Sequence, residues 1–506
     1  MTTDETQSVQ LHRNLSVWEA IGISLALMAP SMAASINPQG TATTVGRAVP
    51  VAFAIAFVGV LLVAYTFVRL TQRFHHSGSV YGFVGATLGP RAGVISGWAL
   101  AGTYVFYAVT TAMAGGRFAA GFLDATGIWK TAATWPGFLL GAIGLVLILW
   151  LAITPARGGT RVLLVAEGVT VALILIVIVI VFAKLAGHSG PGKLGLTGSA
   201  FSLPSGTPLS TLFLGVVFGF LSFAGFEAAA TLGEETKRPT RDIPRAILGV
   251  AIFGGIYFVV VTAVESMGFG TSAAGVKAFI NSPSLIGDLG TQYVSSWIGN
   301  IITLGAMVSA FSCALACVVG AARLIYALGR DGVLHGKLGE VSQTRRTPTF
   351  STIAVVVTAW VIIAFVWAVL RGDPFTLFLY AGTIGTLILL VVYVLATIGM
   401  VRLVFFSGQT EVPRWQMIIP VLGIVVLGYT LFRNIYPFPS GSAWWGPGTA
   451  IVWLVLGVIG AFVLPGAARA GLALMRAEGL AGASASASSA SAGGTSAGPA
   501  ASRADV

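Results

Sequence analysis

The chain has 506 residues, of which 56% are hydrophobic and only 9% are charged, and its formal net charge is +11. Because soluble proteins average about 25% charged residues, this composition excludes a soluble globular protein and indicates a membrane protein with many spans. The basic excess does not indicate nucleic-acid binding, because it follows the asymmetry between loops that the positive-inside rule describes.

Twelve uncharged or nearly uncharged segments follow one another along the chain, and each can cross a hydrocarbon core of about 30 Å. They are expected at residues 20–43, 49–69, 92–116, 134–154, 162–183, 209–232, 245–265, 292–322, 350–370, 375–400, 416–432 and 447–468. With the N-terminus in the cytoplasm, 20 of the 28 Lys and Arg residues lie on the cytoplasmic side and 8 lie outside. This distribution predicts that both termini are cytoplasmic.

The first segment follows a polar cytoplasmic tail over residues 1–18, in which we identify no removable signal peptide. Within this segment, Pro30 interrupts an otherwise apolar helix. Proline has no N–H, and its ring clashes with the carbonyl of the preceding turn. We therefore expect the first helix to break or kink at Pro30.

The sixth segment ends with Ser222-Phe223-Ala224-Gly225-Phe226-Glu227, so that a carboxylate lies in hydrocarbon two residues after a helix-weakening glycine. A charged side chain there costs at least ~2.5–3.5 kcal/mol on insertion scales, so it usually has a partner or a function. Glu167, in the fifth segment, is the second deep carboxylate. Glu19 and Glu265 are expected near segment ends, where headgroup water solvates them, and Asp288 is expected in an outer loop.

The eighth segment carries Ser309 and Ser312 and both cysteines of the chain. Ser309 and Ser312 can offer hydroxyl oxygens to a sodium ion opposite the carbonyls of the first helix. Hydroxyls in helices more often bond to their own backbone, which favours proton coupling over sodium. Cys313 and Cys317 lie one helical turn apart, and we interpret them as small core residues rather than as a disulfide or a metal site.

The two broken segments, the first and the sixth, are five positions apart in the order of segments, as an inverted repeat of five plus five helices requires. The predicted units are a first repeat over 19–205, a second over 206–405 and two extra helices over 406–475. Residues 476–506 are rich in Ala, Ser and Gly and are expected to form a disordered cytoplasmic tail. The broken helices would meet at the midplane around a lined cavity, where hydrocarbon tolerates free backbone groups.

These residues resemble the amino acid–polyamine–organocation transporter superfamily over nearly all of 15–470. The resemblance rests on Gly78–Tyr81, Gly89–Trp98, Ser222–Glu227, Glu234–Ile247 and Arg323–Gly332. It implies an all-α fold of twelve transmembrane helices of the leucine-transporter type, with alternating access and an amino acid or amine held between broken helices one and six. The residues that match the family's substrate site are Ala29, Pro30, Ser31, Met32, Ala33, Ser222, Phe223, Ala224, Gly225 and Phe226.

The chain departs from the family pattern at three places. Ala-Pro-Ser stands where the family often has two glycines that expose amides to the substrate carboxylate. Leu221 stands where several relatives place a gating aromatic residue, so Phe223 or Phe226 is expected to take that role. Glu167 lies near the position of a lysine that contacts helix one in some relatives. A carboxylate cannot mimic a cation there, but it can take up and release a proton.

The sequence therefore predicts a secondary active transporter that moves amino acids across the cell membrane, coupled to protons or exchanging substrates, with Glu227 and Glu167 as proton-coupling candidates. An amine or polyamine permease and a sodium-coupled symporter are the alternatives, and a channel or membrane sensor is the alternative of another class. An enzyme is disfavoured because we find no nucleophile–base or metal constellation. We expect no cofactor, no nucleic-acid partner, and a monomer or loose dimer.

Overall fold

The computed structural model describes residues 16–74, 80–131, 133–154, 159–232, 236–342, 345, 347–370, 372–406, 412–464 and 466–467. The regular elements in these ranges are all helices, and twelve helical spans are long and apolar enough to cross a membrane. The prediction of an all-α protein with twelve membrane-spanning helices is therefore confirmed. The division into two inverted repeats remains a prediction.

The helices run in chain order, with several spans divided into two labelled pieces. The bounds are α1 Val17–Met28, α2 Pro30–Val45, α3 Val49–Arg73, α4 Val80–Leu88, α5 Pro90–Ala125, α6 Trp135–Ile153, α7 Gly159–Ala186, η1 Pro191–Lys193, η2 Gly198–Phe201, η3 Leu209–Thr211, α8 Leu212–Phe223, η4 Ala228–Leu232, α9 Pro239–Phe269, α10 Ala273–Asn281, α11 Leu285–Tyr293, α12 Ser296–Arg330, η5 Gly336–Gly339, α13 Thr349–Phe365, η6 Val366–Leu370, α14 Pro374–Phe405, η7 Arg414–Met417, α15 Ile418–Ile435, η8 Gly441–Trp444 and α16 Trp445–Val463.

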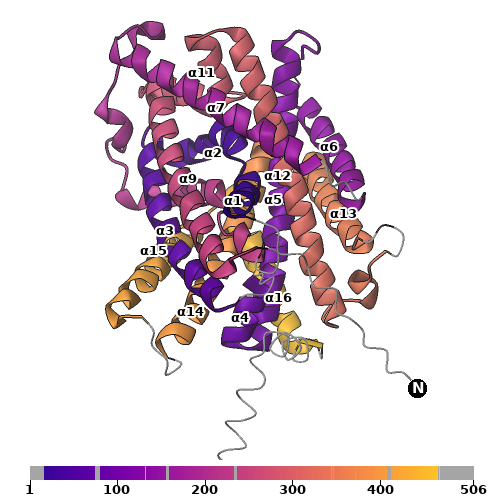
Figure 1. The fold of residues 1–506 in the computed structure, drawn as a ribbon. Coiled ribbons are helices and arrows are strands. Elements are labelled where there is room, and N and C mark those ends of the chain that lie inside the picture. Colours follow the sequence, from indigo (N-terminus) through magenta and orange to yellow (C-terminus); the bar gives the residue numbers. More distant parts are fainter. Residues whose placement is uncertain are drawn as a thin grey trace, which may run out of the picture.

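The spans form one bundle, with α11 at one end and α4 at the other, and α1 lies in the middle of the view (Figure 1). We call these two ends the α11 end and the α4 end. The span of α5 is the most enclosed, with 78% of its apolar window buried, whereas the span over Arg414–Ile435 has 22% buried. A helix that is apolar on all sides must face either protein or lipid. Helix α5 therefore lies at the centre of the bundle, and α15 lies at its periphery.

The connection predicted over 266–291 contains two helices rather than an irregular loop. Helix α9 continues to Phe269, and α10 and α11 follow it at the α11 end. Gln39 of α2 donates through Nε2 to the carbonyls of Phe279 and Ser282 at 2.9 and 2.6 Å. Arg117 of α5 donates to the same Ser282 carbonyl at 2.6 Å. These bonds fasten the α10–α11 connection over the end of α2.

Part of the sequence prediction lies outside the described residues. This applies to most of the N-terminal tail, to the tail over 476–506, and to Gly78 and Ser79 of the proposed family motif. Tyr81 of that motif is the second residue of α4 and donates its hydroxyl to Asp331, just after α12, at 2.9 Å. Burial, followed by the charge of Asp331, raises the pKa of Tyr81, so the phenol keeps the proton that it donates. This bond ties α4 to the end of α12.

Candidate functional site

The first span is broken where the sequence predicts it. Helix α1 ends at Met28 and α2 begins at Pro30, with Ala29 between them at φ 46° and ψ 60°. Proline is well suited to the first position of a helix because that residue's N–H would have no partner inside the helix. The left-handed conformation of Ala29 costs roughly 1–2 kcal/mol, and such strain persists only where the surroundings hold it.

Side chains from two other helices hold the start of α2. The Ser31 amide donates to Oε1 of Glu167 on α7 at 2.9 Å, and the Met32 amide donates to Oγ of Ser309 on α12 at 3.3 Å. On the other side of the break, the Leu27 carbonyl accepts from Sγ of Cys313 at 3.0 Å. The first amides of a helix lack intrahelical partners, so these contacts act as caps. The predicted candidates Glu167 and Ser309 are thus brought together at break one, which we define as Ala29–Met32.

The sixth span is also broken, and the break begins later than predicted. Ser222 and Phe223 are still helical, because α8 ends at Phe223 and η4 begins at Ala228. The irregular stretch between them, which we call break six, is Ala224–Glu227, with Gly225 at φ 104°. A Cβ on Gly225 would lie 2.8 Å from Cβ of Leu27. Glycine is required there both by the backbone conformation and by the close approach of α1.

Break six is satisfied largely by its own residues. The Gly225 amide donates to Oε2 of Glu227 at 3.2 Å, and the Ala228 and Ala230 amides donate to the carbonyls of Gly225 and Glu227 at 2.9 and 2.8 Å. Glu227 is 7% exposed. Tyr393 of α14 lies beside this carboxylate, and its buried hydroxyl has no hydrogen-bond partner in the described part of the chain. Tyr393 is thus the side chain of another helix that lies nearest to share this carboxylate.

Polar contacts join the two breaks to each other and to α9. Nδ2 of Asn37 on α2 donates to Oγ of Ser222 at 2.8 Å. The Ala229 amide, just after break six, donates to Oγ of Ser24 on α1 at 3.0 Å. The Tyr257 hydroxyl of α9 donates to the Pro30 carbonyl at 3.4 Å. The two broken spans therefore form one connected unit.

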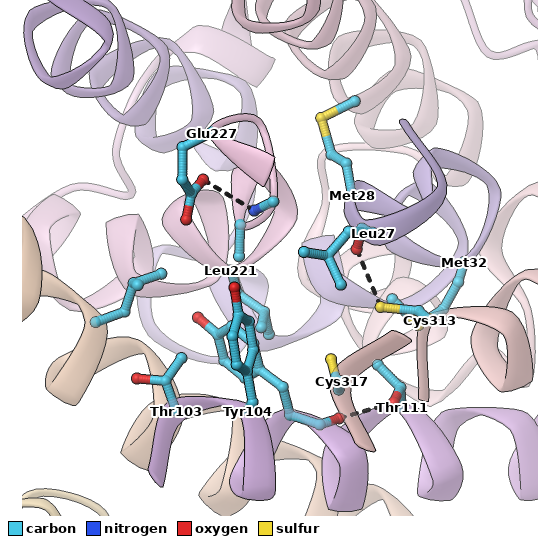
Figure 2. A pocket seen from close by; sticks show the side chains of 14 residues that line it. Leu27, Met28, Met32, Thr103, Tyr104, Thr111, Leu221, Glu227, Cys313 and Cys317 are labelled. Carbon is cyan, nitrogen blue, oxygen red and sulfur yellow. Dashed lines mark hydrogen bonds between the residues drawn. The ribbon is translucent and has the colours of Figure 1, made fainter. Parts of the chain in front are cut away.

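A cavity lies between the broken spans and helices α5, α12 and α14, with about 390 Å³ of unfilled space that includes open solvent. Figure 2 shows Glu227 on one side of this space and Cys313 and Met32 on the other. The lining residues are Leu27, Met28, Met32, Thr103, Tyr104, Tyr107, Thr111, Leu221, Ala224, Gly225, Glu227, Cys313, Cys317 and Leu389. Glu227 is the only charged residue among them.

Three of the ten residues that match the family's substrate site line this cavity, namely Met32, Ala224 and Gly225. The other seven do not line it. They are Ala29, Pro30, Ser31 and Ala33 in and after break one, and Ser222, Phe223 and Phe226 around break six.

The two phenylalanines expected to replace a gating aromatic residue point into the core of the bundle. Phe223 packs against Phe57 and Phe258, with ring centroids 6.3 and 5.3 Å away. Phe226 packs edge-on against Phe67 at 5.9 Å. Leu221 itself lines the cavity. The aliphatic side chain of Leu221 therefore occupies the position that the sequence comparison assigned to an aromatic one.

Sequence reasoning missed the contribution of α5. Thr103, Tyr104, Tyr107 and Thr111 all line the cavity. A signal was present, because residues 103, 107 and 111 recur at four-residue spacing and so share one face of a helix. The hydroxyls of Thr103 and Thr111 donate to backbone carbonyls, whereas Tyr104 makes no hydrogen bond to another described residue. Tyr104 is thus a free donor at the cavity.

The remaining acidic residues are placed differently from one another. Glu19 is exposed and forms a capping box with Ser16 at the start of α1, in line with the predicted solvated end. Asp288 lies on α11 and accepts a hydrogen bond from Ser282 at 2.6 Å; burial raises its pKa. The prediction that Glu265 is solvated is wrong, because its side chain is 0% exposed. Helix α9 continues beyond Glu265, and the following helices cover it.

The eighth predicted segment contributes one face of α12 to the site. Cys313 and Cys317 are both free and buried, and both line the cavity rather than only the core. Ser312, the second sodium candidate, donates to its own helix at the Val308 carbonyl at 2.7 Å. Among the described residues, no group of three or more His, Cys, Asp or Glu side chains is arranged to hold a metal ion.

Comparison with known proteins places these features in a family context. A family model described as amino acid permease matches residues 15–466. The branched-chain amino acid permease BcaP of Bacillus subtilis (strain 168) is 24% identical over 438 residues, which are 83% of this chain and 86% of that protein. The low-affinity putrescine importer PlaP of Escherichia coli (strain K12) is 26% identical over 363 residues, 70% of this chain and 75% of that protein. The methylthioribose transporter of Bacillus subtilis (strain 168) is 23% identical over 476 residues, 90% of this chain and 94% of that protein.

Proposed function

This chain belongs to the amino acid permease family, and we propose that it is a secondary active transporter whose central cavity binds a neutral amino acid with an apolar side chain. The carrying observation is that Glu227 is the one charged side chain in an otherwise apolar and weakly polar cavity lining. One carboxylate pairs with one ammonium group. The remaining wall, which includes Leu27, Leu221 and Leu389, suits an aliphatic substituent.

The polar ends of such a substrate have partners within this cavity. The α-ammonium group pairs with the Glu227 carboxylate, one oxygen of which accepts from the Gly225 amide. The substrate carboxylate accepts a hydrogen bond from the Tyr104 hydroxyl, which bonds to no other described residue. The amides at the start of α2 are less available, because Glu167 and Ser309 already occupy those of Ser31 and Met32.

The names of the relatives leave several substrates to choose between, namely branched-chain amino acids, putrescine and methylthioribose. A diamine carries two cations, and a cavity with Glu227 as its single carboxylate pairs only one of them. A neutral amino acid satisfies the same carboxylate without leaving an unpaired charge. The cavity therefore favours the amino acid over the amine.

For the driving force, we favour proton coupling, with Glu167 and Glu227 as the exchanging carboxyl groups, over sodium coupling through Ser309 and Ser312. Two observations support this choice. The Glu167 carboxylate sits on the first amides of α2, and the Ser312 hydroxyl is engaged with its own helix. Substrate exchange without net proton movement is the further alternative.

We place the protein in the cell membrane with both termini in the cytoplasm. The support for this orientation is the division of the 28 Lys and Arg residues into 20 and 8 on the two sides. The α4 end then faces the cytoplasm, and the α11 end faces outside. Labelling of single introduced cysteines near Gly336 and near Ser272 in intact cells tests this assignment.

The test of the substrate class is a thermal-shift screen of the purified protein against amino acids and amines. A ligand that binds only the folded state raises the unfolding temperature. We expect neutral apolar amino acids to stabilise the wild type, and Glu227→Gln to weaken their binding by about 10- to 100-fold, the worth of a hydrogen bond to a charged group. Glu340→Gln is the matched control, because Glu340 is exposed. Stabilisation by putrescine alone would reassign the substrate class.

A channel or a membrane sensor is the competing function on the same bundle. Uptake into proteoliposomes separates these classes from a transporter. A transporter saturates with substrate and accumulates it against a gradient when driven by an ion gradient, whereas a channel does neither. A sensor binds the ligand without moving it.

A further inference from the structure

A further buried carboxyl group lies outside the cavity, toward the α11 end of α9. Glu265 is 0% exposed, and in the described part of the chain neither carboxylate oxygen has a hydrogen-bond partner. The hydroxyl of the next residue, Ser266, is also buried without a partner. Buried polar groups in proteins are nearly always hydrogen-bonded, and an acidic residue inside a membrane span usually serves a function.

The charged groups on neighbouring helices are engaged elsewhere. Lys184 of α7 donates to the Tyr293 carbonyl of α11 at 2.5 Å, and the Tyr293 phenol donates to a glycine carbonyl of α9 at 3.0 Å. Asp288 of α11 accepts from a serine hydroxyl, and Lys277 of α10 is exposed. None of these groups bonds to Glu265. An unpaired carboxylate buried in this way would cost several kcal/mol, and the neutral acid would cost less.

One side chain connects α9, the helix that carries Glu265, to break one. Tyr257 lies about two turns before Glu265 on α9, given 3.6 residues per turn. Its hydroxyl donates to the Pro30 carbonyl at 3.4 Å. Tyr257 therefore ties the helix of Glu265 to the first residue of α2.

A small hollow lies near this site at the α11 end. About 190 Å³ of unfilled space, which includes open solvent, lies where the α2–α3 corner meets the end of α9 and α10. Ser266 lines it directly beside Glu265 in the sequence, and Arg47 lines it while donating to the Ser202 carbonyl at 3.2 Å. The other lining residues are Gly46, Val49, Gly270, Val276 and Phe279.

We propose that Glu265 is a proton-binding site that exchanges with water at the α11 end and is linked to break one through Tyr257. In the conformation described here, the buried carboxyl group holds its proton. A shift of α2 against α9 changes the contact between Tyr257 and Pro30 and gives Glu265 access to water, so that the proton leaves when the break rearranges. This proposal concerns proton binding, and it rests on the proposed transport function only for its effect on uptake.

Infrared difference spectroscopy of the purified protein without substrate tests the proton directly. A buried protonated carboxyl group gives a carbonyl band that shifts in heavy water. We expect Glu265→Gln to remove one such band, Glu265→Asp to keep an acid band, and Glu340→Gln to leave the spectrum unchanged. Glutamine has the shape of the neutral acid, so the fold should be retained, and Glu265→Asp guards against a folding defect. An unchanged acid band in Glu265→Gln would overturn the proposal.

Proteoliposomes with an internal pH dye then test the link to transport. Glu265→Gln is expected to keep substrate-for-substrate exchange but to lose substrate-driven proton uptake, and Tyr257→Phe is expected to reduce that uptake while keeping the acid band. Proton uptake equal to the wild type in both variants would overturn the link. If the wild type moves no substrate, the proposed function fails, while the infrared result still decides whether Glu265 binds a proton.

Discussion

The two broken spans meet at one cavity, but they are held in different ways. Break one depends on side chains from other helices, because Glu167 of α7 and Ser309 of α12 cap the amides of Ser31 and Met32. Break six depends mainly on itself, since Glu227 accepts from the Gly225 amide two residues earlier. The conformation of break one therefore depends on where α7 and α12 lie. In break six, the Glu227 carboxylate can bind a ligand without giving up a hydrogen bond to another helix.

This difference indicates that the two breaks have different functions. A break that is capped from outside cannot rearrange unless its capping groups change their charge or position, as coupling between an ion and a conformation requires. A break that satisfies its own amides is preorganised, as a ligand-binding site requires. We therefore assign coupling to break one and recognition to break six, and substitutions at each break test the assignment.

The largest effect is expected at break six from Gly225→Ala. The positive φ of 104° and the contact of 2.8 Å between an added Cβ and Leu27 both oppose a side chain there. We expect a destabilisation of roughly 2–4 kcal/mol and a loss of transport of about tenfold or more. Thermal unfolding of the purified protein and initial uptake rates measure the two effects.

Gly249→Ala is the matched control for this substitution. Gly249 lies within α9, and an added Cβ there meets no atom within 4 Å. Alanine favours a helix over glycine by about 1 kcal/mol, so this variant should be as stable as the wild type or more so. Wild-type uptake by Gly225→Ala would show that break six is not a fixed recognition element.

The intermediate effect is expected at break one from Glu167→Gln. Glutamine keeps an oxygen for the Ser31 amide but cannot exchange a proton, so substrate affinity should stay within about threefold while the response to a pH gradient disappears. Glu167→Ala removes the cap as well and should cost a further 0.5–2 kcal/mol or so of stability. Uptake driven by an imposed pH gradient is the measurement. If Glu167→Gln responds to the gradient as the wild type does, Glu167 is a cap and nothing more.

The sequence identified both breaks because each has a local cause. Pro30 cannot continue a helix, and Gly225 allows the backbone conformation that break six needs. One residue was therefore sufficient to predict each break. The partners of the breaks were harder to predict. Ser309 lies 277 residues from Met32, and that contact follows from packing rather than from local pattern. The α5 residues do show a local pattern, the four-residue spacing of Thr103, Tyr107 and Thr111, but that spacing does not show which helices their shared face meets.

The wrong prediction for Glu265 shows what hydropathy in the sequence cannot predict. The apolar segment was expected to end at that residue, because the positions after it are less strongly apolar. In the structure α9 extends four residues further, and α10 and α11 fold over its end. Hydropathy marks which residues tolerate lipid, but it does not show which polar residues another part of the protein will cover.

The smallest effect is expected from Ser309→Ala compared with Ser312→Ala. This pair also tests whether protons or a sodium ion act at break one. Ser309 caps the Met32 amide at 3.3 Å, whereas Ser312 bonds to its own helix at 2.7 Å. Loss of a cap costs about 1 kcal/mol, so Ser309→Ala should lower stability measurably, and Ser312→Ala should stay within about 0.5 kcal/mol of the wild type.

The sodium dependence of uptake is the second measurement on the Ser309→Ala and Ser312→Ala variants, and it is obtained by replacing sodium with choline. If break one is governed by Glu167 and protons, uptake continues in choline, and the two serine variants differ only through the cap. A sodium ion would instead use both hydroxyls as ligands, so that uptake would stop in choline and both variants would weaken the sodium dependence alike. That outcome would move coupling from the carboxylate of α7 to the hydroxyls of α12, while the role of break six in recognition would be unaffected.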